Sequence, residues 1–168
     1  INTGTAGAIN QNASIAFVSD ASNVGGCTPN CTLDIGSRNV AVQANVYNRA
    51  VGSATPTPVV VANQRVSGTG SQVLTVSNTA AAGLFSEALD ASFSGSTGDA
   101  TRSGSFSNLI AGGANNSALI VGVSTTSAGA KSGTVTLAYQ TDGTGSNGLS
   151  GLAADVAGGT PTQTISVS

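Results

Sequence analysis

The sequence SAGAKSGTVTLAYQTD at residues 127–142 decides the fold class of this chain. After a turn of small residues, apolar and polar side chains alternate, which places Val135, Leu137 and Tyr139 on one face of an extended segment. Alternation with a period of two indicates a half-buried β-strand, because successive side chains point to opposite faces of a sheet. We therefore predict a strand here whose apolar face is covered by a second layer.

This stretch occurs a second time near the start of the chain. Residues 5–20, TAGAINQNASIAFVSD, align with residues 127–142 without a gap at an offset of 122. Corresponding residues are Ile15/Leu137, Phe17/Tyr139 and Asp20/Asp142 at this offset, and Val40/Ile165 and Val42/Val167 at an offset of 125. An internal repeat governs the interpretation of the whole fold. We predict a partial repeat at residues 1–50 and a complete repeat domain at residues 51–168.

The partial repeat offers the tail strands of a sandwich without the rest of it. Its predicted strands are 14–19 and 39–47. In the second of these, Val40, Val42 and Val46 fall on one face. A small sheet needs a second layer to bury such a face. We expect this strand to be an assembly surface, packed either on the following domain or on a neighbouring chain.

The complete repeat reads as an all-β domain. Its predicted strands are 59–66, 72–77, 84–94, 101–109, 117–125, 133–141 and 163–168, and turn-forming residues separate them. About seven short strands at this spacing predict an antiparallel β-sandwich of the immunoglobulin type. We interpret residues 52–58 as a linker or edge, because Pro56 and Pro58 cannot donate to a strand ladder. Residues 142–159 form a long glycine-rich loop.

The expected core is aliphatic, since the chain has no Trp. Its members are Val73 or Leu74, Val76, Leu84, Phe85, Leu89, Phe93, Phe106, Leu109, Ile110, Leu119, Val121, Val123, Val135, Leu137, Tyr139, Ile165 and Val167.

Composition and charge narrow the function. Only 7% of the residues are charged and the net charge is −2, so the chain lacks the basic patch of a nucleic-acid-binding protein. No apolar run approaches the roughly 18 residues of a membrane helix, and we expect no membrane insertion. Sparing use of Lys and Glu together with abundant Ser, Thr and Asn favours an extracellular location on a bacterial cell surface.

Three segments carry a family resemblance: GSQVLTVSNTAAAG from residue 70, LIAGGANNSALIVGVSTTSAGAKSGTVTLAYQTDG from residue 109, and the closing TISVS. Together they resemble the domains called choice-of-anchor D or hydin-like, over about residues 59–168. The resemblance implies an immunoglobulin-like sandwich that is repeated in tandem in large bacterial surface or secreted proteins. The loop at 142–159 and the cysteine loop near the start depart from the general pattern.

The residue types and spacings of the chain argue against the common catalytic arrangements. The chain has no His, which excludes a Ser-His-Asp or Cys-His arrangement. Glu87 and Asp90 are three residues apart, which places them on opposite faces of a strand, and we interpret them as solvated edge charges rather than as a pair for glycoside hydrolysis. We therefore expect no enzyme activity.

Two further groups of residues are candidate sites. Cys27 and Cys31 lie in a Gly/Pro/Asn loop, where a small disulfide is the favoured interpretation and metal or redox chemistry the alternative. Asp142, Asn147 and Asp155 could supply oxygen ligands to calcium, although calcium prefers six to eight and a plain glycine loop is the simpler interpretation. Otherwise we expect no cofactor.

The sequence thus predicts a non-catalytic structural or adhesive unit of a bacterial surface fibre, stalk or adhesin. Its expected partners are copies of itself or adjacent repeats, joined by strand addition. The alternative is a module of a larger secreted protein that binds a carbohydrate, host or matrix ligand through residues 142–159.

Overall fold

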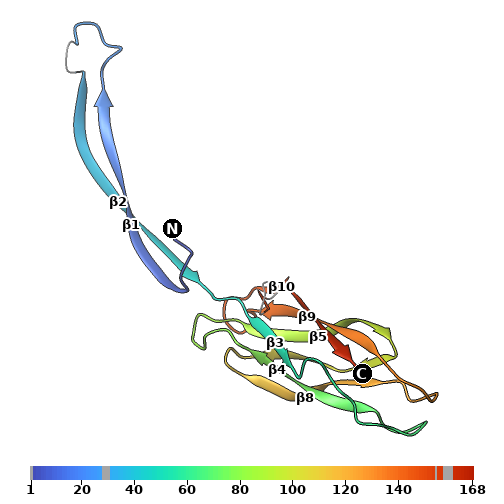
Figure 1. Cartoon of the computed structure of the whole chain (residues 1–168). Helices are drawn as coiled ribbons and strands as arrows, with labels where there is room; N and C mark the ends of the chain where they lie inside the picture. The colour runs from blue at the N-terminus through green and yellow to red at the C-terminus, as the bar shows by residue number, and fades with distance from the viewer. Residues whose placement is uncertain (1, 28–30, 154, 157–160) are drawn as a thin grey trace. The chain divides into compact units, whose positions relative to one another are not determined.

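Regular secondary structure consists of β-strands throughout the computed structural model, which describes residues 2–27, 31–153, 155–156 and 161–168 (Figure 1). The strands are β1 Gly7–Asp20, β2 Thr32–Val46, β3 Val51–Thr55, β4 Ser71–Asn78, β5 Ala88–Gly98, β6 Ala100–Ser103, β7 Ser105–Leu109, β8 Ala114–Val123, β9 Gly133–Asp142, β10 Ser150–Ala153, β11 Asp155–Val156 and β12 Thr162–Val167. In these described ranges no helix is long and apolar enough to span a membrane. The chain divides into two compact units, Ile1–Val46 and Tyr47–Ser168.

The first unit is a long antiparallel hairpin. β1 pairs with β2 from Gly7 opposite Val46 to Asp20 opposite Thr32, with one bulge. Both strands are longer than predicted at 14–19 and 39–47. Polar Asn, Gln and Ser residues between the apolar ones continue the alternation of apolar and polar side chains beyond the predicted ends. Polar side chains of this kind suit the solvated face of a half-buried strand.

The second unit contains two sheets that pack in a sandwich-like arrangement (Figure 1). One sheet has the order β10-β9-β5-β7, with β12 also paired to β9. The other has the order β11-β3-β4-β8-β6. Pairing is antiparallel except between β11 and β3. The prediction of an all-β fold with antiparallel sheets in a sandwich-like arrangement is confirmed.

The core lies between the two sheets and follows the predicted alternation. In β9 the buried residues are Val135, Leu137, Tyr139 and Thr141, every second position. Across from them, β4 contributes Leu74 and Val76, and Leu74 rather than Val73 points inward. The remaining buried apolar members include Leu89, Leu119, Val121, Ile165 and Val167, all of them predicted, and Ala50, Ala54, Val59, Ala91 and Ala100, which were not.

Two predicted core residues are on the surface. Leu84 is 90% exposed and Ile110 is 69% exposed. Leu84 precedes β5, which begins only at Ala88, so the predicted strand at 84–94 starts too early. Ile110 follows the end of β7 in a turn. Neither residue is held in the alternation of a strand, and this is why their apolar character did not place them inside.

The start of the sandwich differs from the prediction. Residues 52–55, part of the stretch 52–58 interpreted as a linker or edge, belong to β3, which lies between β11 and β4. The predicted strand 59–66 is wrong: Val59 makes an isolated bridge to Val167, Val61 donates one backbone hydrogen bond to Ser168, and Val60 is 67% exposed. A β-branched run can extend without joining a sheet, because strand formation depends on the neighbours that the fold supplies.

The predicted strand 101–109 is two strands in different sheets. β6 pairs with β8, whereas β7 pairs with β5. Gly104 stands between them with a φ of +97°, and a Cβ there would lie 1.8 Å from the Ala118 carbonyl oxygen. Only glycine permits this conformation and this close approach. The chain therefore crosses from one sheet to the other at Gly104.

The region 142–159, predicted as a glycine-rich loop, contains two short strands. β10 pairs with β9 and β11 pairs with β3, so the segment extends both sheets of the sandwich. Residues 154 and 157–160 lie outside the described part.

Candidate functional site

The hairpin β1–β2 has one polar and one apolar face. Directly paired residues share a face, so Ala13 with Val40 lies on one side and Ser14 with Asn39 on the other. The polar face carries Asn10, Asn12, Ser14, Asn39, Gln43 and Asn45, and also Ala8, Ala16, Ala41 and the exposed Val18. What we term the apolar face consists of Ile9, Ala13, Ile15, Phe17, Leu33, Ile35, Val40, Val42, Ala44 and Val46. The same face also carries Gln11, Ser19 and Arg38, so the two strands present a mainly apolar stripe with these polar interruptions.

A bulge keeps this stripe continuous. Between the pairs Ala16–Ser37 and Val18–Asp34, β2 contains one residue more than β1. Gly36 in this bulge has a φ of +101°, and its amide donates to Asp34 Oδ1 at 2.8 Å. An extra residue reverses the phase of the alternation. Residues 33 and 35 therefore join the face formed by the even-numbered residues of the rest of β2.

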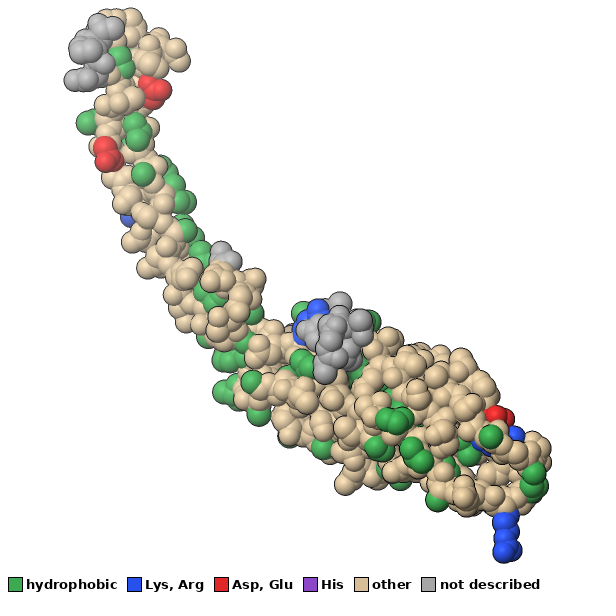
Figure 2. Space-filling model, in the orientation of Figure 1, with side chains coloured by type: hydrophobic (Ala, Val, Ile, Leu, Met, Phe, Trp, Pro, Cys, Tyr) green, Lys and Arg blue, Asp and Glu red, His purple; other side chains and the backbone are tan. Residues whose placement is uncertain are grey.

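Large side chains on the apolar face are open to solvent. Ile15 is 47% exposed, Phe17 43% and Val40 48%, while Leu33 and Ile35 exceed 60%. Figure 2 shows hydrophobic side chains along this hairpin. Soluble proteins rarely leave such a contiguous apolar strip uncovered, and strips of this kind mark interaction sites. The apolar face is the first candidate site.

The predicted assembly residues all lie on this face. Val40 is exposed, and Val42 and Val46 are half-buried. Sequence reasoning did not assign Ile15 and Phe17 to the same surface, although both belong to the predicted repeat. The signal was available, since the antiparallel register of a hairpin brings the odd residues of β1 opposite the even residues of β2.

The cysteines lie at the end of the hairpin. Cys31 O accepts a hydrogen bond from Ala21 N at 2.8 Å, which closes the loop, and residues 28–30 are outside the described part. The predicted disulfide between Cys27 and Cys31 is not formed in this structure. Cys31 Sγ donates to the Cys27 carbonyl oxygen at 2.5 Å. A hydrogen bond with the Cys27 side chain raises the pKa of the Cys31 thiol.

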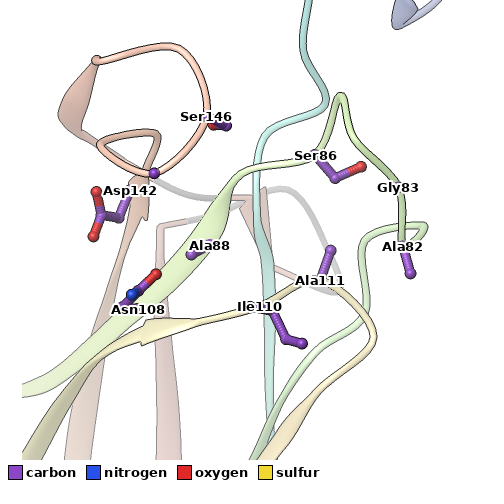
Figure 3. Close-up of a pocket in the computed structure, with 10 residues that line it drawn as sticks. Ala82, Gly83, Ser86, Ala88, Asn108, Ile110, Ala111, Asp142 and Ser146 are labelled. Atoms are coloured by element: carbon purple, nitrogen blue, oxygen red, sulfur yellow. The ribbon is translucent and has the colours of Figure 1, made fainter.

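The second candidate site is a pocket of about 330 Å³ in the sandwich unit (Figure 3). Its polar lining comes from Ser86, Asn108, Asp142 and Ser146, and its apolar lining from Ala82, Ala88, Ile110 and Ala111. These residues belong to the turn after β9, the segment leading into β5, and the end of β7. The volume lies at the lower end of the range for sites that bind small molecules.

One carboxylate anchors the loop beside this pocket. Glu87 is only 5% exposed, and it accepts hydrogen bonds from the Thr141 hydroxyl and from Asn147 Nδ2. The interpretation of Glu87 as a solvated edge charge is wrong. It lies just before β5 and points inward, where hydrogen bonds compensate for the lost hydration of its charge. Asp90, interpreted in the same way, accepts from the Asn108 amide at 2.8 Å.

The predicted calcium ligands make bonds within the loop. Asp142 Oδ1 accepts from the Thr144 hydroxyl at 2.6 Å and from its amide at 2.9 Å, and these bonds hold the pKa of Asp142 below its usual range. Asn147 Oδ1 accepts from the Leu149 amide at 2.8 Å. Asp155 begins β11, and its side chain lies outside what the structure describes. Among the described residues no cluster of three or more Asp, Glu, Cys or His side chains is present. The calcium site stays a prediction.

Comparisons with family models, curated proteins and solved structures give no match to this chain. The resemblance to choice-of-anchor D or hydin-like domains therefore stays a prediction, and function has to be argued from the two candidate sites.

Proposed function

We propose that this chain is a non-catalytic structural or adhesive unit of an extracellular bacterial fibre, stalk or adhesin. In this proposal, the hairpin β1–β2 joins the unit to copies of itself or to adjacent repeats, and the sandwich is of the immunoglobulin type. The observation that carries the proposal is the exposed apolar face of a two-stranded hairpin. A hairpin alone is marginally stable in water, whereas a second layer over its apolar side stabilises it.

Other features support the same proposal. The absence of His from the sequence removes the commonest general base. The buried Glu87 is engaged in loop anchoring. Polar strand faces of Asn, Ser and Thr suit a solvated surface with little charge. The unpaired edge of a hairpin also provides main-chain donors and acceptors for strand addition.

The experiment is a measurement of native mass by light scattering after gel filtration, at two protein concentrations. Assembly through the apolar face predicts masses above the 16.1 kDa of one chain, rising with concentration. Val40→Asp should return the mass to that of one chain, because it places a charge on the apolar face. Asn39→Asp is the matched control on the polar face and should leave assembly intact. A monomer at both concentrations would exclude self-assembly.

The pocket favours a second candidate function, a ligand-binding module of a larger secreted protein. It is lined by Asp142 and Ser146 of the region first proposed to bind a carbohydrate, host or matrix ligand. An Asp carboxylate with Ser and Asn side chains matches the hydroxyl groups of a sugar. Screening the chain on a glycan array tests this function. Ala111→Trp places a large side chain in the pocket from a half-buried position, and loss of glycan binding in this variant would support the function. No binding to any glycan would exclude a carbohydrate as the ligand.

A further inference from the structure

The hairpin β1–β2 has the same register as the β9–β12 pair of the sandwich. The described ladder of β9 with β12 runs from Gly133 opposite Val167 to Ala138 opposite Thr162. Subtracting the repeat offsets, 122 for β9 and 125 for β12, converts these end pairs into Gln11–Val42 and Ala16–Ser37. Both are pairs of the hairpin, and the four pairs between them also coincide. Two strands can pair in many registers, so this agreement identifies equivalent structures.

The turns that follow β1 and β9 are equivalent as well. Asp20 Oδ1 accepts from the Ser22 amide at 2.8 Å, and Asp142 Oδ1 accepts from the Thr144 amide at 2.9 Å. The two Asp acceptors are 122 residues apart, and so are the two amide donors. The residue after each Asp, Ala21 or Gly143, donates its amide to a carbonyl on the returning segment. The repeat therefore extends through the strand into the turn.

The equivalent faces differ in burial. In the sandwich, five residues of β9 and β12 are at most 1% exposed, namely Val135, Leu137, Tyr139, Ile165 and Val167. Their counterparts in the hairpin are Ala13, Ile15, Phe17, Val40 and Val42. Three of these, Ile15, Phe17 and Val40, are more than 40% exposed. The hairpin has the residues of a core face, and the layer that covers this face in the sandwich has no counterpart among the described residues of the first unit.

We infer that β1–β2 is the closing strand pair of a second sandwich whose other strands come from a partner. The partner is an incomplete sandwich of the same type. Its sheet equivalent to β3-β4-β8 covers the apolar face, and its strand equivalent to β5 pairs with the outer edge of β1. In the second unit β9 pairs with β5 on the edge away from β12, whereas the described residues pair β1 with β2 alone. This inference rests on one form of the proposed function, in which the hairpin joins an adjacent repeat rather than a copy of the whole chain, and it names that partner.

Arg38 of the hairpin predicts which chemical groups the partner presents. Gln163 accepts from the Ala54 amide at 2.9 Å and donates to the Ala54 carbonyl at 3.0 Å, which ties β12 to β3 of the opposite sheet. The hairpin has Arg38 at this position. A guanidinium donates hydrogen bonds and cannot accept them. The partner strand at the β3 position is therefore expected to present acceptors, either carbonyl oxygens or a carboxylate.

The test supplies the missing strands in one chain. Residues 47–126, which contain β3 to β8, are placed directly before residue 5, because residue 5 corresponds to residue 127 in the repeat. Amide hydrogen exchange of β1 is then compared with that of the unmodified chain, the original sandwich serving as an internal reference. Closing of a second sandwich should slow exchange of β1 amides by at least about 100-fold.

Matched substitutions in this tandem chain separate the sandwich from nonspecific contact. Val40→Asp should remove the added protection, because its counterpart Ile165 is fully buried, whereas Asn39→Asp should leave it, because its counterpart Thr164 is exposed. Unchanged exchange of β1 beside an intact original sandwich would overturn the inference, whether or not the added segment folds. Concentration-dependent protection in the unmodified chain would overturn it too, in favour of two hairpins packed face to face. Native mass separates the two forms of the proposed function. A mass that rises with concentration supports the joining of whole copies and overturns this inference, whereas a monomer removes only the joining of copies and leaves the adjacent repeat to be tested in the tandem chain.

Discussion

Replacing Glu87 by Gln tests the anchoring of the loop that borders the pocket. The carboxylate accepts two side-chain hydrogen bonds, from Thr141 and Asn147, and Thr141 Oγ1 in turn accepts from the Ala50 amide at 3.1 Å. An amide at position 87 keeps one acceptor oxygen and directs an NH₂ group at a former donor. A hydrogen bond to a charged group contributes about 1.5–3 kcal/mol. Because Glu87 is 5% exposed, solvent cannot replace the lost bond.

We expect Glu87→Gln to lower the free energy of unfolding by about 2 kcal/mol. For a unit of this size, that corresponds to a fall in Tm of about 8 °C. The assay is urea unfolding followed by far-ultraviolet circular dichroism, because the chain has no Trp. A double-mutant cycle with Thr141→Val should give a coupling free energy of about 1 kcal/mol or more, since the two side chains are in contact.

The matched control is Asp90→Asn, three residues further along. Asp90 accepts from a backbone amide, and an Asn oxygen can accept the same bond. This variant should therefore lose less than about 0.5 kcal/mol. Equal losses in the two variants, or a coupling free energy near zero, would refute the reasoning that Glu87 anchors the loop through side-chain hydrogen bonds.

Four further predictions concern packing, pH dependence and thiol chemistry. Gly52→Ala should cost about 1–3 kcal/mol in urea unfolding, because its Cβ would lie 2.6 Å from the Tyr139 ring; a neutral result would mean that the ring moves freely. Burial raises the pKa of Tyr139 above its usual value of about 10, so the neutral form is favoured in the folded state and stability should fall as the pH rises above about 10. Denaturant titrations between pH 8 and 12 check this, and a flat profile would contradict it. Conversely, hydrogen bonds from Thr144 lower the pKa of Asp142, so its contribution should be lost only as the pH falls below about 3.8. Finally, Cys27→Ala should speed alkylation of Cys31 at pH 8, since the hydrogen bond that raises the Cys31 pKa is removed; an unchanged rate would exclude that cause.

Local pattern was sufficient to predict the strands whose side chains alternate cleanly. The strand at residues 133–141 and the strand at 163–168 appear as β9 and β12 with the expected inward faces. The repeat offsets, taken from sequence identity at a few positions, also coincide with the register of both ladders. Alternation fixes which side of a strand is apolar, and register follows because a slip of one residue would turn that side to solvent.

The sequence pattern gave wrong predictions where the structure of a segment depends on contacts with residues distant in the chain. The apolar run at 59–66 makes a single bridge, between Val59 and Val167. Its β-branched residues favour extended backbone, but pairing depends on the strands beside them. The segment around Gly104 changes sheets, which periodicity cannot reveal. Glu87 looked like a surface charge because the groups that satisfy it, Thr141 and Asn147, are more than fifty residues away in sequence.

By itself, the sequence determined the all-β class and the apolar side of each regular strand, because these depend on side-chain alternation within a short segment. The tertiary structure alone decided that β9–β12 is covered and that its counterpart β1–β2 is exposed. Both pairs have the residues of a core face, but burial depends on whether an opposing sheet is present. That opposing sheet is built from segments distant in the chain, and no local pattern specifies where they lie.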